Sequence, residues 1–103
     1  MNSQPSVGRI VHYKLRASDV ESINKRRKDY SDNDKTNWPM GAQAHVGNQV
    51  AEGEVYPMVI TRVWPEDTHG VNGQVLLDGN DLFWATSVKE GNESGEWNWP
   101  PRV

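Results

Sequence analysis

The sequence contains no cysteine, which excludes disulfide bonds, thiolate zinc sites and cysteine nucleophiles. It has no apolar run near the roughly 20 residues that cross a bilayer, and its start, MNSQPSVGRI, lacks the pattern of a signal peptide. Only 35% of the 103 residues are hydrophobic, so the core must be small and oligomerisation would add stability. These absences favour a single cytoplasmic domain spanning residues 1–103.

Motifs of catalysis and metal binding are also missing. The three histidines, His12, His45 and His69, are 33 and 24 residues apart, which is not the spacing of a local metal site. No phosphate-binding loop or nucleophile elbow occurs, and the paired carboxylates lie in predicted turns. We therefore expect a protein that is not an enzyme and that uses no metal and no cofactor. A metal-free phosphodiesterase built from His and Lys is the alternative that this pattern leaves open.

The charge that is present is unevenly distributed. Residues 1–51 carry eight Lys and Arg against five Asp and Glu, or +3, whereas residues 52–103 carry three against nine, or −6. The basic excess lies at Lys14, Arg16 and the 25–28 run. Proteins that bind duplex DNA are usually basic overall, so we expect a local anion site or attraction between subunits instead. For the 25–28 run itself, a solvated helix end is favoured over a site for phosphates or for a negative protein surface.

Tryptophan is abundant, with five residues against a single phenylalanine. The five are Trp38, Trp64, Trp84, Trp97 and Trp99. A core of this size buries about two or three indoles, each with an N–H that needs a partner. The remaining indoles are therefore expected at a groove or at an interface.

Hydrophobic periodicity predicts five short strands and one helix. The strands are expected at residues 7–15, 55–64, 71–79, 82–88 and 97–99. The capping-box spacing from Ser18 to Glu21 predicts a helix that continues to about Lys28. Residues 30–54 are expected to form a long loop, with a short strand near Ala44–Val46.

This order of elements predicts a mainly β fold with one short helix, in the α+β class. Short turns between the middle strands indicate an antiparallel meander. We expect a small SH3-like antiparallel barrel of about five strands, with the helix and the loop inserted after the first strand. A two-layer fold with the helix on one face of a sheet is the alternative.

Five segments, taken in order, resemble a group of small uncharacterised bacteriophage-encoded proteins. They are GRIVHY (8–13), GAQAHVGN (41–48), PMVITRVW (57–64), VNGQVLLDGNDLFWATSV (71–88) and WNWPPR (97–102). The resemblance covers nearly the whole chain and implies a phage context. Small cytoplasmic β-rich phage proteins commonly join the virion or block host defences, and some of the inhibitors are oligomeric sponges that sequester cyclic-nucleotide signals.

Several side chains are candidates for holding an anionic ligand. Arg62 stands in an apolar strand, where a charge needs a carboxylate or a ligand anion. Trp84, Thr86 and Ser87 combine an indole with two hydroxyls, which suits a nucleotide pocket, although core packing of Trp84 is an equal alternative. The other candidates for charge or stacking are Lys14, Arg16, Arg26, Trp64 and Trp97.

Together these features favour a non-enzymatic phage protein of the host cytoplasm, a homo-oligomer that binds and sequesters a small anionic ligand between subunits. The expected ligand is a cyclic nucleotide or oligonucleotide immune signal, and neither a membrane nor duplex DNA is an expected partner. A protein-interaction module, either virion-associated or inhibiting a host protein, is the alternative and would use the same tryptophans as anchors. A weaker alternative is single-stranded nucleic-acid binding on a small barrel.

Overall fold

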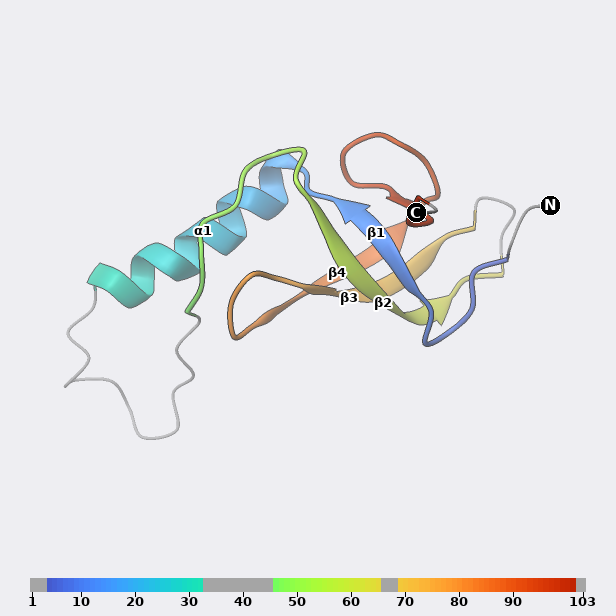
Figure 1. The fold of residues 1–103 in the computed structure, drawn as a ribbon, viewed down its shortest axis with the longest axis horizontal. Coiled ribbons are helices and arrows are strands. Elements are labelled where there is room, and N and C mark those ends of the chain that lie inside the picture. The colour runs from blue at the N-terminus through green and yellow to red at the C-terminus, as the bar shows by residue number, and fades with distance from the viewer. Residues whose placement is uncertain (1–3, 33–45, 66–68, 102–103) are drawn as a thin grey trace.

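The computed structural model describes residues 4–32, 46–65 and 69–101, without the side chains of residues 30–32. The elements are β1 (Ile10–Lys14), α1 (Ala17–Asp32), β2 (Val55–Val63), β3 (Val71–Leu76), β4 (Leu82–Val88) and β5 (Trp97–Asn98) (Figure 1). The strands form one antiparallel sheet in the order β4-β3-β2-β1-β5. The chain is therefore a small α+β fold that is mainly β, as predicted. No helix in these ranges has the length and apolar character needed to cross a membrane.

The sheet has a buried side and an exposed side, which we call the core side and the outer side. On β1, Val11 and Tyr13 are fully buried, and His12 between them faces outward. The pairing continues this alternation, because Val11 lies opposite the buried Met58. Alternation with period two is thus what separates the core from the outer side.

The predicted barrel is not confirmed, because the sheet is open. Between β4 and β5 the chain forms an isolated bridge, in which Glu90 pairs with Trp97 of β5. The Trp97 amide donates to the carbonyl of Lys89 at 2.9 Å, and the Gly91 amide donates to the carbonyl of Trp97 at 2.9 Å. These contacts occupy the free edge of β5 without joining it to β4.

Two β-bulges interrupt the sheet side by side. On β2, Ile60 pairs with Gly73 and Arg62 pairs with Asn72, so Thr61 is an extra residue. The register between β3 and β4 also shifts between Val71 and Gly73, and Ser87 has a φ of 53° there. A bulge bends its strand and turns the following side chains to the other face.

The helix begins slightly earlier than expected, continues to Asp32 rather than ending at about Lys28, and uses a different cap. The carboxylate of Asp19, rather than a Ser18–Glu21 capping box, accepts the amide N–H of Arg16 at 3.0 Å. In a capping box, the side chain at the third helical position accepts the amide N–H of the cap residue. Asp19 and Arg16 make this bond, two residues closer to the N-terminus than the predicted box. The hydroxyl of Tyr13 also donates to Asp19, and burial raises the pKa of Tyr13, with the hydrogen bond to Asp19 adding to the effect.

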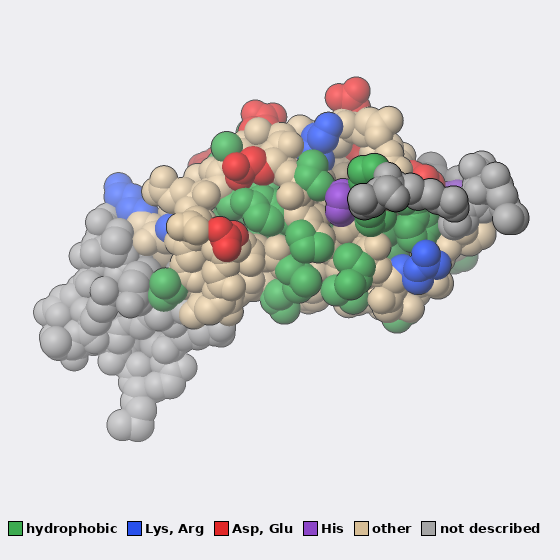
Figure 2. Space-filling view, in the orientation of Figure 1, with side chains coloured by type: hydrophobic (Ala, Val, Ile, Leu, Met, Phe, Trp, Pro, Cys, Tyr) green, Lys and Arg blue, Asp and Glu red, His purple; other side chains and the backbone are tan. Residues whose placement is uncertain are grey.

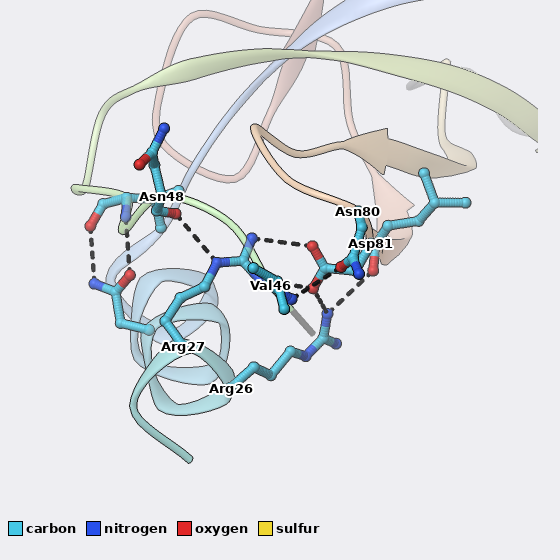
Figure 3. Close-up of polar contacts among 9 residues, drawn as sticks. Arg26, Arg27, Val46, Asn48, Asn80 and Asp81 are labelled. Carbon is cyan, nitrogen blue, oxygen red and sulfur yellow. Dashed lines mark hydrogen bonds and ion pairs between the residues drawn. The ribbon is translucent and has the colours of Figure 1, made fainter. Parts of the chain in front are cut away.

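The region expected as a long loop is described only in part. Residues 33–45 lie outside the described residues, and they include most of the short strand expected near Ala44–Val46. Val46 belongs to no strand, and the adjacent Gly47 forms a single bridge with Gly79. The described segment from 46 to 50 runs between α1 and the turn after β3, as Figure 3 shows.

A buried ion pair joins α1 to the start of β4. The guanidinium of Arg27 donates two hydrogen bonds to the carboxylate of Asp81, at 2.9 and 3.0 Å, and both side chains are almost fully buried. Arg26 donates to the same carboxylate at 3.2 Å (Figure 3). The interpretation of the 25–28 run as a solvated helix end is therefore wrong, because α1 continues to Asp32 and two arginines of the run bond to Asp81.

Polar contacts also join α1 to residues 46–50. The side-chain amide of Asn24 donates to the carbonyl of Val50 at 2.8 Å, and its oxygen accepts the amide N–H of Val50 at 2.8 Å. The Arg27 Nε donates to the carbonyl of Asn48 at 3.2 Å. Among the described side chains of α1, Ile23 is fully buried and Val20 packs against the core, so the helix depends strongly on these polar contacts.

Asp81→Asn is expected to lower the free energy of unfolding by about 3–5 kcal/mol, because it leaves the buried Arg27 charge without its carboxylate. Urea denaturation followed by circular dichroism measures this change. Asp29→Asn is the matched control, because Asp29 pairs with Lys25 on the exposed side of the same helix and should change stability by less than about 0.5 kcal/mol. Equal effects of the two variants would contradict a structural role for the Arg27–Asp81 pair.

Stability should also fall in acid through Asp81. Burial by itself would raise the pKa of this carboxyl, but the hydrogen bonds and charges of Arg27 and Arg26 outweigh burial and hold the pKa below its ordinary value. The contribution of Asp81 is therefore present at neutral pH and is lost as the pH falls below about 4 toward the lowered folded-state pKa. Thermal melts from pH 7 to pH 2 should show a smaller loss for Asp81→Asn than for the native protein.

Candidate functional site

A groove of about 310 Å³ opens beside β1, between the outer side of the sheet and the turn that leads to β5. The outward-facing side chains of β1 form its floor, and residues of the turn and of the C-terminal segment form its walls. The polar and aromatic residues that line it are His12, Lys14, Asn92, Glu96, Asn98 and Trp99.

Strand pairing places the floor of the groove. His12 and Lys14 alternate with buried residues on β1, so both face the outer side. His12 lies opposite Asn98 of β5, and Lys14 lies opposite Val55 at the start of β2. Three strands therefore contribute to one surface, although their residues are far apart in the sequence.

The turn from residue 91 to 96 is tied to Lys14. Its ammonium donates to the carbonyl of Asn92 at 2.6 Å, and its backbone carbonyl accepts the amide N–H of Gly95 at 2.8 Å. The carboxylate of Glu96 accepts the amide N–H of Glu93 at 3.0 Å within the same turn. The groove wall is therefore held by specific bonds at both ends of the turn.

Trp97 and Trp99 have different roles. Trp97 is fully buried, and its indole N–H donates to the carbonyl of His69 at 2.8 Å. Trp99 is half-buried and meets Trp97 edge to face, with ring centroids 5.4 Å apart. The guanidinium of Arg9 lies 4.7 Å from the centroid of Trp99. Trp97 therefore supports the groove from beneath, and Trp99 is the indole that a ligand can reach.

The groove combines an ammonium at Lys14, a carboxylate at Glu96, two side-chain amides and an indole. A ligand that satisfies all of them carries an anionic group, hydrogen-bond donors and a flat ring. Within the described residues no group of three His, Cys, Asp or Glu side chains could hold a metal ion.

Most of the predicted ligand residues lie elsewhere. Lys14 alone among them lines the groove. Arg16 is exposed and pairs with Asp19 at 3.2 Å, and Arg26 pairs with Asp81. Trp84 is exposed on β4, so the alternative that it packs in the core is wrong. Trp97, predicted to stack on a ligand, is covered completely in this conformation.

Arg62, Trp64 and Ser87 do come together, at the two bulges. The Asn72 side-chain oxygen accepts the indole N–H of Trp64 at 3.0 Å and the amide N–H of Ser87 at 2.7 Å. The Arg62 guanidinium stacks on the Trp64 ring, 4.1 Å from its centroid. Thr86 is exposed beside Ser87.

The expectation that Arg62 needs a carboxylate or a ligand anion is wrong. Simple alternation would place Arg62 on the core side with Met58 and Ile60, but the bulge at Thr61 turns it outward. Arg62 is exposed, and within the described residues it makes no ion pair with a carboxylate. Water and the face of Trp64 satisfy its charge, so no buried partner is required.

Sequence reasoning missed His12, Asn92, Glu96 and Asn98, and it placed Trp99 only among the indoles expected at a groove or at an interface. The signal in the sequence was weak. His12 and Lys14 share one face of a predicted strand, and the segment EGNESGE is a long polar turn directly before two tryptophans. Neither pattern shows that the turn folds back over β1.

Comparisons with protein-family models, with curated proteins and with solved structures found no match to this chain.

Asn72→Ala should lower the free energy of unfolding by about 1–3 kcal/mol, since it leaves the Trp64 indole and the Ser87 amide without their shared acceptor. Denaturation followed by far-ultraviolet circular dichroism measures the change. Thr61→Val is the matched control. It also removes a hydrogen bond to Asn72, since the Thr61 hydroxyl donates to the Asn72 carbonyl at 3.2 Å, but Thr61 is exposed, so the free energy of unfolding should change less. An unchanged stability for Asn72→Ala would show that the bulges do not depend on this residue.

Proposed function

We propose that this protein binds and sequesters a small anionic ligand in the groove beside β1, and that it does so without catalysing a reaction. The observation that carries the proposal is the meeting of Lys14 and Trp99 in one groove with amide and carboxylate groups between them. This arrangement suits a nucleotide, and the ligand that we expect is a cyclic nucleotide or oligonucleotide signal. In the phage context that the resemblance implies, such binding would counter a host defence.

Each part of a nucleotide has a complementary group in the groove. A phosphate would be held by the Lys14 ammonium, and a base would contact the part of the Trp99 indole that Arg9 and Trp97 leave uncovered. Exocyclic N–H groups of the base would donate to Glu96, because the side-chain oxygens of Asn92 and Asn98 already accept hydrogen bonds within the protein. A simple inorganic anion would meet the Glu96 carboxylate without these compensating bonds, so it should bind more weakly.

The size of the groove limits what it encloses. Ligand pockets span about 300–1,000 Å³, and this groove lies at the lower end of that range. One nucleotide unit would therefore be buried, and the rest of a larger cyclic signal would extend over the open outer side. Arg62, Arg16 and Arg26 were predicted to hold the anionic ligand, but this mode of binding does not need their positive charges.

A protein-interaction module is the second candidate. The observation that favours it is the exposure of Trp84 and Leu82 on β4, since exposed aromatic residues commonly anchor interfaces. Binding of single-stranded nucleic acid was the weaker alternative on a small barrel, and it stays a prediction although the sheet is open.

A thermal-shift screen against cyclic mono-, di- and trinucleotides tests the proposal. A ligand at 100 times its Kd should stabilise the folded protein by about 2.7 kcal/mol and raise its Tm. Lys14→Met should weaken binding by about 1.5–3 kcal/mol, the scale of a hydrogen bond to a charged group. Because Lys14 also bonds to Asn92, the Tm of the unliganded variant must be measured alongside its affinity.

Arg62→Ala is the matched control, because it removes an exposed cation on the same side of the sheet but outside the groove. It should leave nucleotide affinity unchanged. Failure of every nucleotide to raise the Tm, or an equal loss of affinity in Arg62→Ala, would overturn the proposal. The nucleotide should also be recovered intact after incubation, and its cleavage would instead support the phosphodiesterase alternative.

A further inference from the structure

The outer side of the sheet is unusually apolar for a chain with 25 charged residues among 103. Strand pairing places Ile10, Val59, Gln74 and Trp84 in one row across four strands. Trp84 is 62% exposed and Ile10 is 53% exposed at the two ends of this row. Figure 2 shows hydrophobic side chains gathered over the strands on one face of the molecule.

The apolar character is strongest at the edge strand β4. Its sequence, LFWATSV, contains no charged residue and no proline. Leu82 is 49% exposed, and Leu76 opposite it on β3 is 37% exposed. Edge strands of monomeric proteins usually carry Lys or Pro or are very short, because an open edge pairs with other chains. Among the described residues, the features that protect β4 lie at its two ends: Arg26 of α1 donates to the Leu82 carbonyl at 3.1 Å at its start, and the bulge interrupts its end.

The two edges of the sheet differ in a way that determines what can pair there. β5 has two residues, and the segment from Lys89 to Gly91 occupies its free side through backbone hydrogen bonds. Among the described residues no strand pairs with the far side of β4. Pairing of β4 with the opposite edge of another copy, which would build an open filament, is therefore blocked at β5.

We propose that β4 is a dimerisation edge, paired antiparallel with β4 of a second copy about a two-fold axis. The occupant is a second copy because the edge is self-complementary in charge: an uncharged strand meets an uncharged strand, with no repulsion between like charges. Antiparallel pairing brings two copies each of Leu76, Leu82 and Trp84 onto one continuous outer side. An apolar centre with paired tryptophans is the composition that stable interfaces use.

Light scattering after size-exclusion chromatography, at micromolar concentrations, tests this proposal. The native protein should have twice the 11.7 kDa mass of the chain. Trp84→Lys and Leu82→Lys should each elute with the mass of one chain, because a buried lysine at the edge opposes pairing. Both residues are exposed in the single chain, so circular dichroism should show an unchanged fold.

Ile10→Lys is the matched control, since it places the same charge on the same side of the sheet at the other end of the row. Its mass should remain that of the native dimer. A native mass of one chain, a dimer that persists in both β4 variants, or a dimer lost in Ile10→Lys would each overturn the proposal. The outcome is separate from that of the groove, because nucleotide binding is measured by thermal shift on the monomeric variants as well.

Discussion

The buried contact between Arg27 and Asp81 is the constraint on which the helical half of the fold depends. The helix contributes little apolar surface, so the charge pair with Asp81 and side-chain hydrogen bonds to the backbone of Asn48 and Val50 hold it at the end of the sheet. The same guanidinium passes beside Gly47 and Gly79, which pack closely together. A Cβ on Gly47 would lie 2.6 Å from the Gly79 Cα and 2.9 Å from the guanidinium, so a side chain there would force the two segments apart.

Periodicity in the sequence was sufficient to place the strands, and insufficient to set the direction of every side chain. The expected strands at 55–64, 71–79 and 82–88 correspond closely to β2, β3 and β4. The side of Arg62 was wrong because one extra residue at Thr61 reverses the alternation. No local propensity marks that residue as a bulge, since the bonds that accompany it, from Trp64 and Ser87 to Asn72, join residues far apart in the sequence.

The groove could not be predicted for a related reason. The strand, the turn and the tryptophan that form the groove could each be predicted from the sequence. The turn at residues 92–96 lies against β1 because of long-range hydrogen bonds with Lys14, which the sequence does not reveal. The role of the 25–28 run was also hidden, because the carboxylate that neutralises Arg27 lies 54 positions later in the sequence. Such contacts follow from tertiary packing and leave no spacing pattern behind.

The groove and the β4 edge lie on opposite margins of the same sheet, since β1 and β5 are separated from β4 by β2 and β3. Dimerisation through β4 would therefore place the two grooves at the far ends of a continuous sheet, each formed by a single chain. This differs from the pocket between subunits that the sequence suggested. The two sites would share no residues, so we expect each copy to take up its ligand independently. A dimer of this kind would sequester ligand in proportion to the number of chains, and its second subunit would contribute stability rather than affinity.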